Sequence, residues 1–196
     1  MAGPRAGARS PLRDLRGFTR AAEHKLPYDV VFILNRYFEA VGGAIQRAGG
    51  IRTSSRAYGV MALFGVETGA ELGCRQAVAA ARAIVQSLAR LNRELGEDLP
   101  EALRIGIGIH AGPAIVGRMG YGEGVYLTAV GDTVHVARRL EQLTKEYGCA
   151  LVLSEQVASR AAIDVSAFPR HELTVRNRGG PVAVRVIDDL ERLESA

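Results

Sequence analysis

Residues 105–112 read Ile-Gly-Ile-Gly-Ile-His-Ala-Gly, and their pattern is the clearest indication of how the chain folds. Isoleucine and glycine alternate with a period of two, the period at which side chains of a β-strand return to the same face. Glycine inside a strand often marks a place where another part of the chain approaches the backbone closely. We therefore predict a strand from about 103 to 109 that packs closely against a neighbouring element.

Outward from this strand, the hydrophobic pattern switches between helical and strand periods. Helices are predicted from Pro27 to the Gly49-Gly50 pair, over 71–95, over 133–147 and over the short segment 155–161. Hairpins interrupt the alternation of strands and helices, so the expected class is α+β, with helices packed over a mostly antiparallel central sheet. The other predicted strands span 60–64, 114–117, 126–130, 149–153, 171–175 and 182–187.

The composition fits one domain. The chain has 196 residues, of which 47% are hydrophobic, and its net charge is +4. We expect residues 1–11, rich in Ala, Gly, Arg and Pro, to be disordered, residues 12–190 to form the domain and 191–196 to be a tail. No apolar run reaches the ~20 residues that span a bilayer, and Met1 to Ser10 lacks the apolar stretch of a signal peptide, so a cytoplasmic protein is expected.

The sequence argues against a zinc site and against a nucleic-acid-binding surface. Cys74 and Cys149 lie far apart, and neither has a second Cys or a His at metal-ligand spacing, so we expect buried free thiols in place of a zinc site. Aromatic residues make up 6% of the chain, and no strand carries the paired aromatics that stack on bases, so no nucleic-acid partner is expected.

Four segments together carry a family resemblance. They are Asp14-Leu15-Arg16-Gly17-Phe18-Thr19, Gly59-Val60-Met61-Ala62-Leu63-Phe64-Gly65, residues 105–112, and Gly131-Asp132-Thr133-Val134 with Arg139-Leu140-Glu141. In order and spacing, the set resembles the signature segments of class III adenylate/guanylate cyclases over residues 12–188. The resemblance implies the nucleotidyl cyclase fold, a ferredoxin-like α/β sandwich.

The resemblance also implies a reaction and a shared site. The ribose 3′-oxygen of ATP attacks the α-phosphorus and releases pyrophosphate, with two Mg²⁺ or Mn²⁺ ions held by two aspartates. A loop after the first aspartate offers backbone N–H groups to the phosphates, and an Asn and an Arg on a helix of the other subunit complete the site. A dimer, as a homodimer or with another cyclase domain, is therefore expected, and an isolated subunit should be inactive.

Carried over position by position, several residues match the family. Asp14 matches the first metal-binding aspartate, and the carbonyl of Leu15 matches a further metal ligand. The phosphate loop corresponds to Gly17, Phe18 and Thr19. Thr128 fits the base-reading position and is compatible with adenine, Arg139 matches the transition-state arginine, and Arg178 loosely matches a basic phosphate contact.

At three positions of the implied site, the chain has a different residue from the one that the family pattern requires. Tyr58 stands where the second metal-binding aspartate is expected, Ser54 replaces the base-reading lysine and His135 replaces the helix asparagine. A phenol with a pKa near ~10 is a poor ligand for Mg²⁺ at neutral pH. His135 can still donate a hydrogen bond.

Each retained residue also has a simpler interpretation. Asp14 can be a turn residue, Arg139 a solvated helix arginine beside Arg138, and Thr128 an ordinary strand former. We interpret His110 as structural and Asp132 as a helix N-cap. The sequence thus predicts an adenylate cyclase domain making cyclic AMP. The alternative is a non-catalytic cyclase-homology module that dimerises with an intact cyclase.

Overall fold

The computed structural model describes residues 4–16, 18, 25–53, 59–96, 99, 101–121, 125–175 and 180–193, with 4–16 described by their backbone. Within these ranges, the helices that accompany the sheet are α2 (Pro27–Arg47), α3 (Ala70–Leu95), α4 (Asp132–Glu146), α5 (Glu155–Ala161) and the 3-10 helix η2 (Leu190–Arg192). The strands are β1 (Pro4–Arg16), β2 (Ile51–Thr53), β3 (Val60–Phe64), β4 (Arg104–Met119), β5 (Tyr126–Val130), β6 (Leu151–Ser154), β7 (Arg170–Leu173) and β8 (Val182–Ile187).

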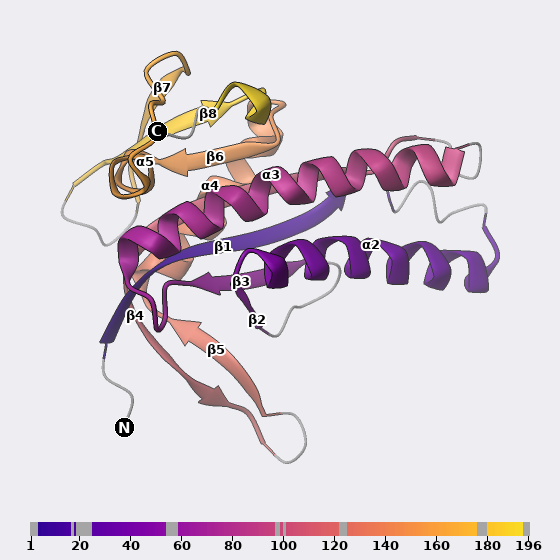
Figure 1. The fold of residues 1–196 in the computed structure, drawn as a ribbon, viewed down its shortest axis with the longest axis horizontal. Coiled ribbons are helices and arrows are strands. Elements are labelled where there is room, and N and C mark those ends of the chain that lie inside the picture. The colour runs from indigo at the N-terminus through magenta and orange to yellow at the C-terminus, as the bar shows by residue number, and fades with distance from the viewer. Residues whose placement is uncertain are drawn as a thin grey trace.

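These strands form one mixed sheet that is mostly antiparallel, as predicted. Its order is β2-β3-β1-β4-β6-β8-β7, and β5 pairs with β4 beyond this path. Among the described strands, β4 and β6 run parallel and the other pairs are antiparallel. The β4–β5 hairpin projects away from the body of the domain (Figure 1). Within the described ranges, no helix has the length and apolarity to cross a membrane.

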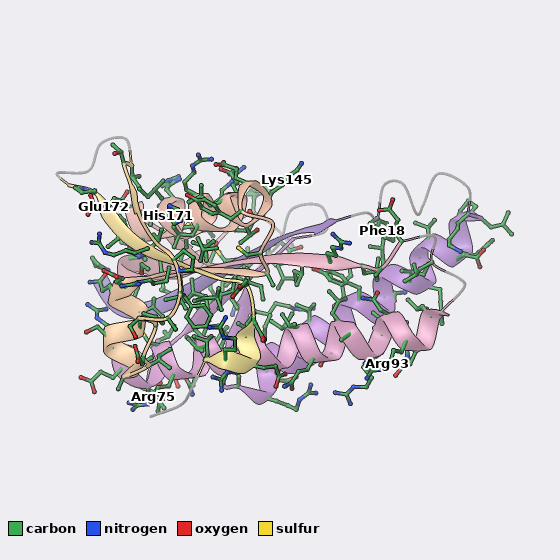
Figure 2. All side chains as sticks on the ribbon, turned by 90° about the horizontal axis from the view of Figure 1, so that it is seen from above. Phe18, Arg75, Arg93, Lys145, His171 and Glu172 are labelled. Atoms are coloured by element: carbon green, nitrogen blue, oxygen red, sulfur yellow. The ribbon has the colours of Figure 1, made fainter. Side chains whose placement is uncertain are left out.

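The helices cover both faces of the sheet, which gives the predicted α+β sandwich. Ile105, Ile107 and Ile109 of β4 are buried in a large core together with side chains of α2, α3 and α5. Helix α4 packs on the opposite face, where its own apolar side chains form a separate cluster with β6 and β8. Figure 2 shows Arg93 of α3 and Lys145 of α4 on opposite sides of the sheet.

The glycines of β4 allow α4 to lie directly on the strand. A Cβ placed on Gly108 would come within 2.3 Å of the Ala137 carbonyl oxygen and 2.4 Å of the Glu141 nitrogen. One at Gly112 would come within 2.6 Å of the Thr133 hydroxyl oxygen. The neighbouring element that was predicted to pack closely against this strand is therefore α4.

Strand β1 differs most from the sequence-based expectation. Residues 4–11, predicted to be disordered, belong to a strand that pairs with β3 on one side and β4 on the other. Pro11 lies inside this central strand, although proline is usually confined to sheet edges and strand starts. The β1–β4 pairing is interrupted between Arg9 and Leu12, which is where proline lacks a backbone donor.

Two smaller differences concern strand limits. The predicted strands 103–109 and 114–117 are one continuous strand, β4, because Pro113 is accommodated within it opposite Ala6 of β1. The three-residue strand β2 was not predicted, being too short to show a period. Both cysteines are buried free thiols, as expected, and burial raises the pKa of Cys74 to about 11.

We predict that Gly108→Ala destabilises the domain strongly, whereas Gly117→Ala does not. The new methyl at 108 would collide with helix backbone, which cannot rotate away, so the expected loss is about 3 kcal/mol. At Gly117, also in β4, no atom lies within 4 Å of the added Cβ. Urea unfolding of both variants measures the difference, and equal midpoints would show that α4 does not rest on Gly108.

Candidate functional site

The turn from β5 into α4 fixes the start of the helix that carries two of the predicted catalytic residues. Gly131 caps the helix with φ 144°, a backbone conformation that favours glycine. The Thr133 hydroxyl in the first turn donates a 2.6 Å hydrogen bond to the Pro113 carbonyl of β4. Asp132 is the first helical residue and not the N-cap that we predicted, because Gly131 occupies that position.

His135 and Arg139 lie one turn apart on the exposed face of α4. Residues at i and i+4 share a helix face, so both side chains project in a similar direction. The opposite face is buried against the sheet through Val136, Ala137 and Leu140. The structure thus places on one helix face the two residues at the positions of the family's catalytic asparagine and arginine.

Arg139 is held loosely in the described chain. Its guanidinium lies 3.2 Å from the Glu146 carboxylate, and both side chains are about half exposed. Exposed ion pairs of this kind contribute about 0–1 kcal/mol. Arg139 is therefore accessible to a stronger anionic partner such as a phosphate.

Thr128 lies on β5, just before this turn, and is half-buried. It pairs with Gly117 of β4. Side chains of alternate residues share a strand face, which places Thr128 between Tyr126 and Val130, both about half exposed. Thr128, His135 and Arg139 consequently belong to one strand–turn–helix unit.

Asp14 and Leu15 lie at the far end of β1 from its start at Pro4. The β1–β4 register shifts between Arg13, opposite Gly106, and Leu15, opposite Ile105, so Asp14 occupies a β-bulge. Bulges re-aim side chains and are frequent beside active sites. Phe18, predicted in the phosphate loop, is instead buried in the large core at 2% exposure, and Figure 2 shows its position.

Five of the predicted site residues lie outside the described part of the chain. They are Gly17, Thr19, Ser54, Tyr58 and Arg178. His110, interpreted as structural, is buried, and its Nδ1 lies 2.9 Å from the Ser154 hydroxyl oxygen of β6.

The two halves of the predicted site are separated within one chain. Asp14 lies beside Gly106, whereas Thr128 lies beside Gly117, eleven residues further along β4. At the rise of an extended strand this spacing corresponds to roughly 35 Å along the strand. The structure does not bring Asp14 together with Thr128, His135 and Arg139 in a single copy.

The donor set does not fit the two-ion site that the resemblance implies. Asp14 is one carboxylate, the Leu15 carbonyl is neutral, and the position of the second carboxylate holds Tyr58. Mg²⁺ prefers charged or hard oxygen ligands in octahedral geometry, and one aspartate with a phenol offers too little charge for two ions. Among the described residues, no group of three or more His, Cys, Asp or Glu side chains is placed to hold a metal ion.

Comparison with known proteins decides the family. A family model for the adenylate and guanylate cyclase catalytic domain matches residues 12–186. The chain belongs to this family. It is 35% identical to an adenylate cyclase of Anabaena cylindrica and 32% identical to adenylate cyclase 1 of Rhizobium meliloti, each over 148 residues. Those alignments cover 74% and 75% of the chain but only 28% and 22% of the relatives, so the cyclase domain spans about a quarter of their length.

A solved structure shows the same fold. The crystal structure of the guanylyl cyclase Cya2 superposes with a TM-score of 0.80 and 26% identity, covering 100% of this chain and 99% of that one. The nucleotidyl cyclase fold predicted from the four sequence segments is confirmed.

Sequence reasoning missed a group of exposed apolar side chains beside the predicted base-reading residue. They lie on the β4–β5 hairpin, and the signal was available: Tyr126 and Val130 alternate with the inward-facing Leu127 and Ala129, so both faces of β5 are apolar. The exposed members are Ile115, Met119, Tyr121, Tyr126 and Val130.

Thr133→Val is expected to loosen the attachment of α4 to β4. The substitution keeps the shape but removes the hydroxyl that bonds to Pro113, at a cost of about 1–2 kcal/mol. Thr133→Ser keeps the hydroxyl and serves as the control. Thermal unfolding should rank wild type and Thr133→Ser above Thr133→Val; the reverse order would contradict the role given to this bond.

Proposed function

We propose that this domain takes part in the conversion of ATP to cyclic AMP and pyrophosphate as one half of a dimeric cyclase. Its contribution is the half-site formed by Thr128, His135 and Arg139. The observation that carries this proposal is the exposed pair His135 and Arg139 on a helix whose other face is fixed to the sheet. A rigid helix presents both donors to a substrate held outside this chain.

Arg139 supplies positive charge where negative charge develops on the phosphate in the transition state. His135 lies one turn closer to the helix start and supplies a ring nitrogen that can donate to the ribose or phosphate oxygens. Thr128 offers a hydroxyl that donates and accepts, which suits the amino group and ring nitrogen of adenine. The similarity to two bacterial adenylate cyclases supports ATP as the nucleotide.

Dimerisation is supported by the exposed apolar side chains of the hairpin. Tyr121 is 97% exposed and Ile115 is 55% exposed on an arm that projects from the domain (Figure 1). Contiguous exposed apolar surface on a folded domain marks a protein interface. The separation of Asp14 from Thr128 along β4 also supports a dimer, because a second copy of the fold is needed to bring both halves of the site to one nucleotide.

The productive partner we propose is an intact cyclase domain. Such a partner supplies both carboxylates, and any Mg²⁺ or Mn²⁺ ions with them, while this chain supplies Arg139. A homodimer has Asp14 but lacks the second carboxylate in both of its sites. A homodimeric adenylate cyclase remains the second candidate, favoured by the presence of Asp14, Thr128 and Arg139 in the same chain.

A complementation assay tests the proposal. The partner is the Anabaena cylindrica cyclase domain in which the arginine equivalent to Arg139 has been replaced by alanine. Mixing it with this chain should restore Mg²⁺- or Mn²⁺-dependent cyclic AMP formation. In the mixture, Arg139→Ala should lower the rate by about 10²–10³-fold, the cost of losing one transition-state donor.

Arg138→Ala is the matched control, because Arg138 is the adjacent exposed arginine of α4. It should leave the restored rate within a few-fold of wild type. If the mixture makes no more cyclic AMP than the arginine-deficient partner alone, the proposal is wrong. Substantial activity of the unmixed chain would instead favour the homodimer.

Restoring the missing groups gives an independent prediction. Tyr58→Asp with Ser54→Lys should give the unmixed chain metal-dependent cyclic AMP formation at least ~10-fold above wild type, since a second hard anionic ligand is then available. Ser54→Lys alone should give no gain. An inactive double variant would show that β1 or His135 also prevents catalysis in the homodimer.

A further inference from the structure

A cavity of about 570 Å³ lies at the end of the sheet remote from the β4–β5 hairpin. It opens where the parallel strands β4 and β6 begin, between the last turns of α3 and the end of α4. Its size is that of a site for a small organic molecule. None of Thr128, His135 or Arg139 lines it.

An apolar floor is formed by α3, by the start of β4 with the residue before it, and by the segment between α4 and β6. Removing hydrocarbon from water onto such a floor contributes about 25 cal/mol per Å². The apolar lining residues are Val85, Leu88, Leu103, Ile105, Cys149 and Ala150.

Hydrogen bonds hold the walls in place without a ligand. The Asn92 side chain of α3 donates to the Leu103 carbonyl and accepts from the Leu103 amide, both at 2.9 Å. On the other wall, the Cys149 amide donates to the Thr144 carbonyl at 3.0 Å and the Ile107 amide to the Ala150 carbonyl at 2.8 Å. A preformed site loses little conformational entropy on binding.

The polar side chains at the mouth are predominantly basic. Arg104 of β4 and Lys145 of α4 line the cavity, are exposed, and make no ion pair within the described chain. The acidic lining residue Asp188 has a basic neighbour of its own, with its carboxylate 3.9 Å from the Arg192 guanidinium.

Arg104 is the stronger anion-binding group of the two. Lys145 lies in the last turn of α4, where its charge is partly offset by the negative end of the helix dipole. Arg104 lies on a strand, and its planar guanidinium can bind a carboxylate, sulfonate or phosphate through two parallel hydrogen bonds.

The geometry points to a second ligand site in this domain, one that binds a small amphiphilic organic anion. Its hydrocarbon or ring portion rests on the apolar floor, and its acidic group faces Arg104 with support from Lys145. This inference does not depend on the proposed cyclase activity, since the cavity shares no residue with the Thr128–Arg139 half-site.

The test uses two fluorescent probes that differ by one charge. 1-Anilinonaphthalene-8-sulfonate carries an aromatic body and a sulfonate, and N-phenyl-1-naphthylamine has the same rings without the acid. The wild-type chain should bind the sulfonate at a saturable site and prefer it to the neutral probe. Arg104→Gln should weaken sulfonate binding by about tenfold, as for loss of a charge-assisted hydrogen bond, and remove the preference.

Matched variants locate the site. Arg93→Gln removes an exposed arginine of α3 that does not line the cavity and should change affinity by less than about twofold, as for a screened surface charge. Ala89→Phe places a ring in the cavity and should abolish saturable binding, whereas Ala79→Phe, at another exposed alanine of α3, should not. Wild-type affinity in both Arg104→Gln and Ala89→Phe, or no saturable binding to the wild type, would overturn the inference.

Discussion

The close approach of α4 to Gly108 fixes how this helix sits on the sheet. A helix backbone can contact a strand at this distance only where the strand has no side chain. The contact sets the height of α4 above the sheet, and the Thr133–Pro113 hydrogen bond sets the position of its first turn. Because both are fixed, the exposed face of the helix has one orientation. The packing of the buried face of α4 therefore determines where His135 and Arg139 lie. A functional residue placed in this way needs few interactions of its own.

Much of this arrangement could be predicted from the sequence because the decisive signals are local. The Ile-Gly alternation of β4 and the periodic apolar positions of α3 each depend on neighbouring residues, and the structure confirms the elements they predict. Strand β1 could not be predicted in this way. Its residues include Pro11 and several arginines, and their pairing is imposed by β3 and β4 on either side. The exposed apolar side of the hairpin was missed because β5 also buries residues on its other face.

His135 takes no part in the packing that holds α4 on the sheet. Its side chain lies on the exposed face of the helix, whereas the clusters on the two faces of the sheet are formed by other residues of the described chain. A change at position 135 can therefore alter the groups that α4 offers to a ligand without altering its contact with Gly108.

Strand β1 is translated before its two neighbours in the sheet, yet it lies between them. β3 follows it after about fifty residues, whereas β4 follows only after roughly a hundred, and pairing over such a distance is slow to form. Until β4 has been translated, β1 can pair on one side only, and the backbone groups of its other edge have no strand partner. The central strand of this sheet therefore acquires its second neighbour late in folding.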